Sequence, residues 1–429
     1  MNQKKIFILA AALFITACAG GVRKKGKPFV IMHPRNPALD RIFQKIGKEF
    51  QAAHPHLKVE LQPAYATGFY SKILTAMAGG SAPDVFYMTG KAVTDFGQRG
   101  TLADLGPFIE KDNFPLGDIP PQALDEIGIN SGNIFALPLT GGASALFYNK
   151  DLFERCGLAE PDNKWTWKEY LQAAKKLTID EDKDGRPDVI GTSSDLTYWA
   201  GMLPWIWAAG GDLLSLDGNQ CTVGSEQAAV AVQFHLDLIN KHKVTVNESS
   251  LSTTGTSSEL FSTGKVAMMV TLPWAIWEMA STGRKNKLNI ALPPAGPQKR
   301  ISRYTGEAVV IWAGSKYKEE AWDFLKRITS AAVGNELVKR YWQSTRLSVL
   351  QSSVFQNPDT EFREEILYKV LVNSRSLPDM RKLGGQDGII RDIWNNEMTL
   401  CIKDGKSAAA ALLEIQHKLN AELHNYKSK

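Results

Sequence analysis

The 429-residue chain contains little cysteine and little histidine, four and seven residues respectively. No Cys-x-x-Cys pair and no Cys/His spacing typical of a zinc site occurs, which argues against a metal centre of that kind. The motifs G-x-S-x-G, H-E-x-x-H, Walker A and G-x-G-x-x-G are also missing, so no common hydrolase, protease or nucleotide-binding signature is present. After the N-terminal segment, no run approaches the roughly 18 apolar residues of a membrane-spanning helix.

The bulk composition is that of an ordinary soluble globular protein. Hydrophobic residues make up 44% and charged residues 22% of the chain, and no repeat or low-complexity tract interrupts it. The net charge is +5, but much of the positive charge lies within the first 27 residues. The rest of the chain is close to neutral, which argues against a nucleic-acid-binding surface.

The N-terminus has the three parts of a signal peptide. Two lysines lie within Met1 to Lys5, Ile6 to Ala17 is apolar or small, and Cys18 follows directly. This junction resembles the lipobox of bacterial lipoproteins, in which the cysteine is lipidated and becomes the first mature residue. The resemblance implies a signal peptide over residues 1–17, a lipidated tether over 18–26, and an extracytoplasmic protein anchored in the cell envelope. It does not say which membrane holds the anchor.

Strand and helix patterns alternate in the first part of the mature chain. Phe29 to His33, Leu57 to Leu61 and Asp84 to Tyr87 have the pattern of strands. A helix begins after the cap Asn36, and Tyr70 to Ala78 has the pattern of a second helix. This order predicts an α/β unit built on a mainly parallel sheet with helices on its faces.

The same alternation restarts after residue 139 and predicts a second α/β unit. The expected elements are a strand at Ala145 to Tyr148, a helix opened by the capping box Thr166 to Glu169, a helix over Ala228 to Ile239, a strand at Val266 to Val270 and a last helix from about Ser407 to Tyr426. The remaining cysteines allow at most one disulfide, and their spacing leaves their redox state open.

Four sequence blocks resemble the extracellular solute-binding proteins of ABC importers, in particular the sugar-binding family that includes maltose-binding protein. The blocks are Gly79-Gly80-Ser81-Ala82-Pro83-Asp84-Val85; Tyr148-Asn149-Lys150-Asp151-Leu152-Phe153 followed by Trp165 to Glu169; Phe261 to Met269 ending in Pro273-Trp274; and Tyr304-Thr305-Gly306-Glu307 running into Ala308 to Trp312.

The resemblance implies the two-lobe fold of periplasmic binding proteins, with a hinge between the lobes. We expect residues 27–139 and 287–339 in lobe 1, and residues 140–286 and 340–429 in lobe 2. Thr140-Gly141-Gly142 lies at the first crossover, where glycines supply conformational freedom to a hinge. The implied mechanism is closure of the lobes on a ligand that contacts both.

The implied function is that of a monomeric substrate-binding lipoprotein, not an enzyme, which delivers a carbohydrate or polyol to a membrane permease. The ligand class stays open between a sugar, an oligosaccharide and a polyol phosphate. A binding protein that feeds a receptor and a tethered carbohydrate-active enzyme are the alternatives.

Sugars present apolar faces, so their sites need flat aromatic side chains. Trp274 follows the third block and is the main candidate for stacking on the ligand. Trp199 is a second candidate, because the corresponding region lines the cleft in relatives. For Trp205 and Trp207 the sequence favours packing in the core.

Polar candidates lie where strands end or where relatives use side chains of the second lobe. Open α/β sheets bind ligands beyond the carboxyl ends of their strands. The polar candidates are Arg35, Thr89, Lys91, Thr140, Gly306, Glu307, Arg346 and Arg381.

An acidic segment offers a separate metal hypothesis. Asp180, Asp182 and Asp184 occupy alternate positions before Gly185, with Asp188 beyond, as in an EF-hand-type calcium loop. The twelfth position is Gly191 instead of the bidentate glutamate of that loop, and a polar helix-to-strand connection is the other explanation. No other cofactor is implied.

Overall fold

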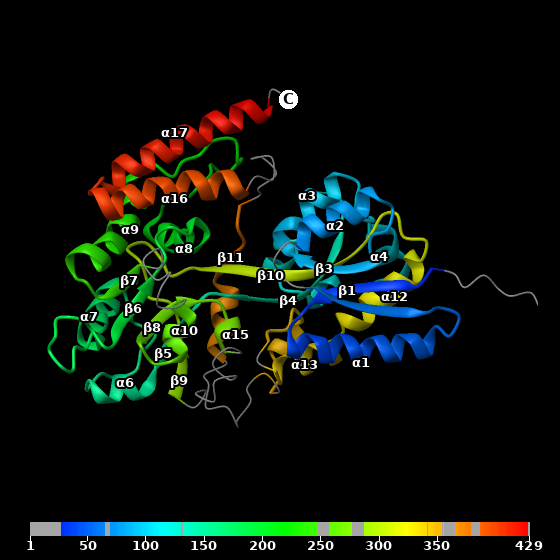
Figure 1. Cartoon of the computed structure of the whole chain (residues 1–429), viewed down its shortest axis with the longest axis horizontal. Helices are drawn as coiled ribbons and strands as arrows, with labels where there is room; N and C mark the ends of the chain where they lie inside the picture. The colour runs from blue at the N-terminus through cyan, green and yellow to red at the C-terminus, as the bar shows by residue number, and fades with distance from the viewer. Residues whose placement is uncertain are drawn as a thin grey trace, which may run out of the picture.

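The computed structural model describes residues 27–64, 69–129, 132–247, 257–276, 287–340, 342–353, 355, 365–378 and 387–427. Its strands form two separate sheets, each covered by helices. The first sheet with its helices is called the first lobe below, and the second sheet with its helices the second lobe. Figure 1 shows the two lobes side by side, with α1 at one end of the molecule and α7 at the other.

The first sheet has the strand order β11-β10-β3-β1-β2, with β4 paired to β10. Its strands are β1 (Phe29–Pro34), β2 (Val59–Ala64), β3 (Val85–Thr89), β4 (Ala136–Ala143), β10 (Ser302–Ile311) and β11 (Ser374–Arg375). Strand β1 is parallel to β2 and β3, whereas β10 is antiparallel to β3 and β4. The sheet is therefore mixed.

Two apolar clusters lie on the two faces of this sheet. One involves α1 (Pro37–Ala53), α12 (Lys318–Ile328) and α13 (Ala331–Val338), and the other α2 (Phe69–Ala78) and α3 (Gly90–Gln98). Helix α1 begins as predicted, because the Asn36 side chain accepts hydrogen bonds from the Ala38 and Leu39 amides. The connecting helices are α4 (Gly106–Asp112), η1 (Leu116–Asp118) and α5 (Pro121–Glu126).

The second sheet has the order β7-β6-β8-β5-β9. Its strands are β5 (Ala145–Asn149), β6 (Ile190–Ser194), β7 (Thr245–Asn247), β8 (Val266–Thr271) and β9 (Leu288–Ala291). The helices around it are α6 (Lys150–Arg155), α7 (Trp167–Leu177), α8 (Trp199–Ala209), α9 (Glu226–Leu236) with the π-helix η3 (Asp237–Lys241), α10 (Ser257–Ser262), α14 (Leu347–Leu350), α15 (Glu365–Val372), α16 (Asp387–Asp404) and α17 (Ala408–Lys427).

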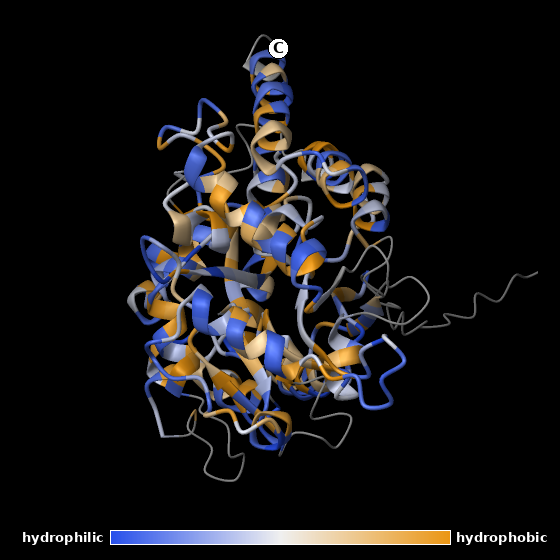
Figure 2. Cartoon of the chain, turned by 90° about the vertical axis from the view of Figure 1, so that its left-hand side faces the viewer, coloured by the Kyte–Doolittle hydropathy of each residue, from blue (hydrophilic) through white to orange (hydrophobic). Residues whose placement is uncertain are grey.

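Orange and blue residues are interspersed along the ribbons in Figure 2, as expected for helices that bury one face. The predicted capping box of α7 is present, with both Thr166–Glu169 hydrogen bonds formed. None of the helices in the described residues combines the length and the apolarity needed to cross a membrane.

The two-lobe α/β fold is confirmed, but strand pairing corrects two details of the prediction. Both sheets mix parallel and antiparallel pairs, since β10 is antiparallel to β3 and β4, and β5 is antiparallel to β8 and β9. Strand β9 pairs with β5, so residues 288–291 belong to the second lobe. The predicted boundary at residue 287 had placed them in the first lobe. The other predicted lobe boundaries stay predictions.

Three cysteines lie in the described residues, and all three are free thiols: Cys156, Cys221 and Cys401. Burial raises the pKa of Cys221 to about 12 and that of Cys401 to about 11. Since the thiolate is the reactive form, these two side chains act as small apolar core residues.

Glu397 is the buried acid that ties α16 to α17. It is 3% exposed and accepts hydrogen bonds from the ammonium groups of Lys406 at 2.5 Å and Lys418 at 2.7 Å. Burial by itself raises the pKa of Glu397, but the two lysines outweigh burial and leave that pKa below its ordinary value. The carboxylate form therefore stabilises the folded state.

We predict that Glu397→Gln lowers the free energy of unfolding at pH 7 by about 1–3 kcal/mol, because a buried charge-assisted pair is lost. A depressed pKa contributes stability above the unfolded value and loses it as pH falls through the folded one. The difference between variant and parent should thus shrink in acid below about pH 4, measured by urea unfolding. Glu414→Gln is the control: it removes a half-exposed partner of Lys418 and should change stability by less than about 0.5 kcal/mol.

Candidate ligand-binding site

Strands β4 and β10 connect the two lobes (Figure 1), and glycines face each other where they cross. Gly141 pairs with Gly306, and Thr140 with Glu307, next to an irregularity in the register. A Cβ on Gly141 would lie 2.0 Å from the Tyr304 hydroxyl and 3.0 Å from the Gly306 Cα. Neither Gly141 nor Gly142 has a positive φ. Glycine is needed here for the close approach of two chains, and not for the backbone freedom expected from the sequence.

A small cavity of about 70 Å³ adjoins this crossing. It brings together four of the predicted site residues: Trp274, Thr140, Gly306 and Glu307. The full lining is Thr140, Gly141, Gly142, Leu272, Pro273, Trp274, Thr305, Gly306, Glu307, Trp342 and Gln343. Trp274 reaches the cavity because it comes three residues after the carboxyl end of β8, as expected for an open α/β sheet.

A larger cavity of about 450 Å³ shares Leu272 and Trp274 with the small one. Its walls come mostly from β6, α8, β8 and the start of β10. The lining is Ser144, Ser193, Ser194, Asp195, Tyr198, Gly201, Met202, Pro204, Trp205, His235, Ser258, Met269, Val270, Thr271, Leu272, Trp274 and Arg303. Hydroxyl groups and aromatic rings therefore converge on one hollow.

Trp274 and Tyr198 are the exposed aromatic residues among the large apolar side chains of the described chain, 37% and 39% exposed. Both line the larger cavity. Flat apolar rings left in contact with water are costly unless a ligand covers them, and rings beside hydroxyls suit the two kinds of surface that a sugar presents.

A pair of carboxyl groups lies on the first-lobe side of the crossing. Burial raises the pKa of Glu126 to about 7, against the opposing charges of Arg303 and Lys91. Burial, and then the negative charge of Glu126, raise the pKa of Glu307 to about 8. At neutral pH each group is therefore protonated in part, and a protonated carboxyl donates a hydrogen bond as well as accepting one.

The other first-lobe candidates differ in how close they come to this pair. Thr89 lies opposite Glu307 in the β3–β10 register and is hydrogen-bonded to the Tyr70 hydroxyl at 2.9 Å. Lys91 lowers the pKa of both carboxyls, so its ammonium group is near them. Arg35 is exposed at the end of β1. None of these three residues lines either cavity.

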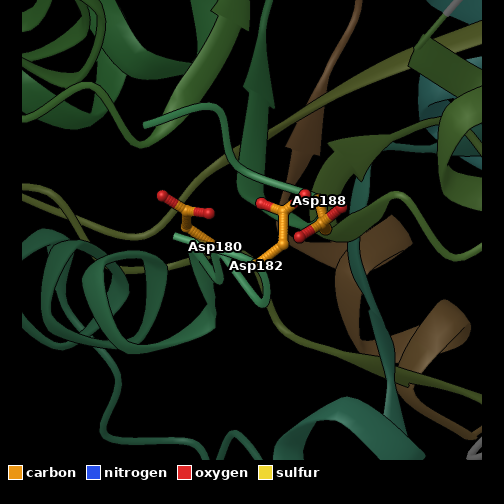
Figure 3. Close-up of side chains that lie close together, drawn as sticks. All are labelled: Asp180, Asp182 and Asp188. Atoms are coloured by element: carbon orange, nitrogen blue, oxygen red, sulfur yellow. The ribbon is translucent and has the colours of Figure 1, made fainter. Parts of the chain in front are cut away.

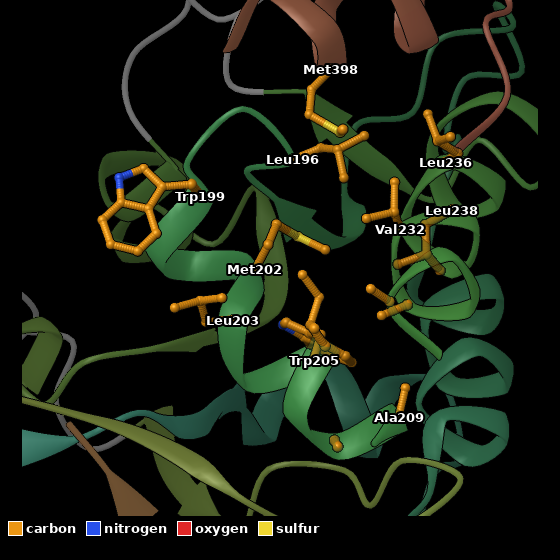
Figure 4. Packing of buried hydrophobic residues seen from close by; sticks show 14 of the residues in the cluster. Leu196, Trp199, Met202, Leu203, Trp205, Ala209, Val232, Leu236, Leu238 and Met398 are labelled. Carbon is orange, nitrogen blue, oxygen red and sulfur yellow. The ribbon is translucent and has the colours of Figure 1, made fainter. Parts of the chain in front are cut away.

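Two predicted ligand contacts have side chains that are buried in the framework and line neither cavity. Trp199 is 1% exposed and packs in the apolar core of the second lobe, as Figure 4 shows. Arg346 is 4% exposed; its Nε donates to the Thr329 carbonyl at 2.6 Å, and its guanidinium lies over Phe114. Arg381 and Cys18 lie outside the described residues.

Sequence reasoning missed several cleft residues, chiefly Tyr198, Arg303, Trp342 and Gln343. Tyr198 immediately precedes α8, and Trp199 is the first residue of that helix. Although the two are adjacent in sequence, the Tyr198 side chain is exposed and the Trp199 side chain is buried. Arg303 lies two residues before Thr305 on β10, so strand alternation puts both on one side of the strand. Arg303 immediately precedes the fourth sequence block, so the same alternation could have been extended to it.

The acidic loop between α7 and β6 gathers three carboxylates. One oxygen each of Asp180, Asp182 and Asp188 lies within 4.8 Å of the others. Figure 3 shows these three side chains on the loop. Backbone amides already bind much of the loop: Gly185 donates to Asp180, Asp184 to Asp182, and Glu181 to Asp188. Asp184 accepts from the Arg186 amide and is outside the cluster.

The loop fits a calcium ion only in part. Three carboxylate oxygens are fewer than the six to eight ligands that calcium prefers, so carbonyls and water would have to supply the rest. At the twelfth position, a Cβ on Gly191 would lie 2.0 Å from the Ala174 carbonyl oxygen, so that strand position has no room for the glutamate of an EF-hand. The calcium prediction stays a prediction.

Calcium removal tests it directly. Calcium bound only by the folded protein would raise the melting temperature by mass action, so a chelator should lower it and millimolar calcium should restore it. Asp182→Asn should abolish that calcium response. Identical melting curves in chelator and in calcium would leave the hydrogen-bonded loop as the whole explanation.

Comparison with known proteins agrees with this architecture. The family model "Bacterial extracellular solute-binding protein" matches residues 36–335. The chain belongs to this family. A Brucella abortus protein designated a binding protein is 26% identical over 66% of this chain and 67% of its own length. The resemblance seen in the four sequence blocks is thus confirmed.

Two solved structures share the fold of this solute-binding protein over almost its whole length. An ABC substrate-binding protein from Listeria monocytogenes, in complex with cycloalternan, is 23% identical with a TM-score of 0.81; the match covers 92% of this chain and 99% of that one. The GacH receptor of Streptomyces glaucescens, studied with acarbose, is 24% identical with a TM-score of 0.77, covering 93% and 99%. At these identities the likeness shows the two-lobe fold.

Proposed function

We propose that this chain is the substrate-binding lipoprotein of an ABC importer, which captures a carbohydrate between its lobes and delivers it to a membrane permease. The observation that carries the proposal is the placement of both exposed aromatic rings, Trp274 and Tyr198, on one hydroxyl-lined cavity. The ligands of the two structural neighbours, cycloalternan and acarbose, support a carbohydrate. The N-terminal lipobox supports a tether to the envelope membrane.

Ligand capture would work through the crossing of β4 and β10. Thr140 and Glu307 lie on the crossing itself, whereas Trp274 follows a strand of the second lobe. A ligand that contacts both sides gains its full set of contacts only when the lobes are closed on it, so binding shifts the hinge equilibrium. The closed form would then be the one that the permease recognises.

The carboxyl pair supports binding over glycoside hydrolysis. Glycosidases that use two carboxyls need one protonated and one ionised group, held in contrasting environments. Here burial raises the pKa of both Glu126 and Glu307. Neither pKa lies below its ordinary value, as that of a glycosidase nucleophile would, so the pair is better suited to hydrogen bonds with sugar hydroxyls.

Trp274→Ala should weaken carbohydrate binding without unfolding the protein. Loss of a stacking surface worth about 2–3 kcal/mol predicts an affinity roughly ten to a hundred times lower, measured by titration calorimetry.

Trp322→Ala is the matched control for that variant. Trp322 is 2% exposed, donates to Asp112 at 2.9 Å and lines neither cavity. Its truncation should cost about 3–5 kcal/mol of stability while the remaining folded protein binds normally. If Trp274→Ala instead binds normally and melts far lower, the proposed cleft is misplaced.

Cys18→Ser tests the anchor separately. Without the thiol no acyl chain can be attached, and each buried methylene contributes roughly 0.8 kcal/mol to membrane anchoring. The variant should therefore leave the detergent phase in a partitioning experiment, or remain uncleaved, while its lobes still bind ligand. Normal cleavage together with parent-like partitioning into detergent would contradict the lipoprotein assignment.

A further inference from the structure

Four buried polar groups without a hydrogen-bond partner surround the cleft in the described part of the chain. They are Arg303 Nε, His235 Nε2, Trp342 Nε1 and the Tyr304 hydroxyl. Arg303 and His235 line the larger cavity, and Trp342 lines the smaller one. A guanidinium and an indole can only donate, and a phenol can donate. The cleft therefore holds unused donors, whose natural complement is a ligand rich in acceptors.

Arg303 is the charged member of this group. Arg303 is only 5% exposed. Its Nη1 donates to the Tyr198 hydroxyl at 3.3 Å, and its guanidinium carbon lies 5.5 Å from the centre of the Tyr198 ring. No hydrogen bond of Nε or Nη2 is formed within the described residues. The side of the guanidinium that binds a carboxylate or phosphate through two parallel bonds is thus the side left without a partner.

The environment of Arg303 does not supply a full counter-charge. Within the described residues it forms no ion pair, whereas Arg375, its neighbour in the β10–β11 register, pairs with Asp212 at 2.6 Å. The charge of Arg303 acts on Glu126, but without ion-pair contact. Asp195 lines the same cavity, yet one of its oxygens is held by Thr197 and the Tyr198 amide. A buried cation without an ion-pair partner lowers the stability of the folded protein unless another anionic group pairs with it.

We propose that the ligand is a carbohydrate with an anionic group, a uronic-acid carboxylate or a sugar phosphate, which binds Arg303 in the larger cavity while a sugar ring lies against Trp274. This inference rests on the proposed carbohydrate function. Serine and threonine residues that line the same cavity, among them Ser193 and Thr271, offer hydroxyl donors to such a ligand.

The test compares acidic and neutral sugars on the unmodified protein. Mono- to tetrasaccharides are screened by thermal shift in matched sets: a neutral sugar, its uronate and its 6-phosphate. Calorimetry then follows on the best set. The acidic member should bind at least about ten times more tightly than the neutral one, and its affinity should fall as salt rises from about 50 to about 500 mM. The uronate and phosphate members identify the source of the anion.

Two variants locate the anion. Arg303→Gln should lower affinity for the acidic sugar by about ten- to a hundred-fold and leave affinity for the neutral sugar nearly unchanged, whereas Arg303→Lys should retain part of the selectivity. Arg375→Gln removes a neighbouring arginine outside both cavities and should change neither. If Arg303→Gln fails to fold, the lysine variant and the salt dependence still decide the question.

The outcomes separate the two proposals. Neutral sugars that bind as tightly as their acidic counterparts would overturn the anionic ligand and leave the carbohydrate function in place. If no sugar of either kind binds, the proposed function fails and this inference fails with it. Equal loss of acidic and neutral binding in Arg303→Gln would make Arg303 a framework residue, which also overturns the proposal.

Discussion

The cleft depends on the close crossing of β4 and β10 at Gly141 and Gly306. Because neither residue has a side chain, two strands and the Tyr304 ring fit where any Cβ would collide. The same antiparallel pairing places Thr140 opposite Glu307. Strand alternation then places Arg303, Thr305 and Glu307 on the side that faces Glu126. The pairing of β4 with β10 thus helps to position the polar side chains Arg303, Thr305 and Glu307.

Two acidic and two basic side chains lie around this pairing of β4 and β10. Glu126 and Glu307 are buried together; the charge of Lys91 acts on both carboxyls and that of Arg303 on Glu126. In a region of low dielectric constant such groups respond strongly to any charge or hydrogen bond that a ligand adds. The second-lobe framework contrasts with this arrangement, since Glu397 there is fully paired by two lysines.

Tryptophans show how the same side chain serves two purposes in one protein. Trp199 and Trp207 are each 1% exposed and consolidate the second-lobe core, whereas Trp274, at the end of β8, keeps 37% of its surface exposed. Trp274 lines both cavities. Solvent-exposed rings at strand ends are consistent with a binding surface, and buried rings within helices with packing.

Sequence alone determined the features that depend on local pattern and on ordered motifs. Hydrophobic periodicity and capping residues located β1, α1, α7 and β8 nearly to their observed ends, and the four blocks established the family and the two-lobe fold. Trp274, Thr140, Gly306 and Glu307 were placed at the cleft because they follow strands or lie at a crossover. Only the tertiary structure decided the burial of Trp199 and Arg346, the membership of β9 in the second sheet, and the position of Arg303 on the larger cavity. Those outcomes depend on which face of an element meets another element distant in sequence, and local pattern carries no information about that contact.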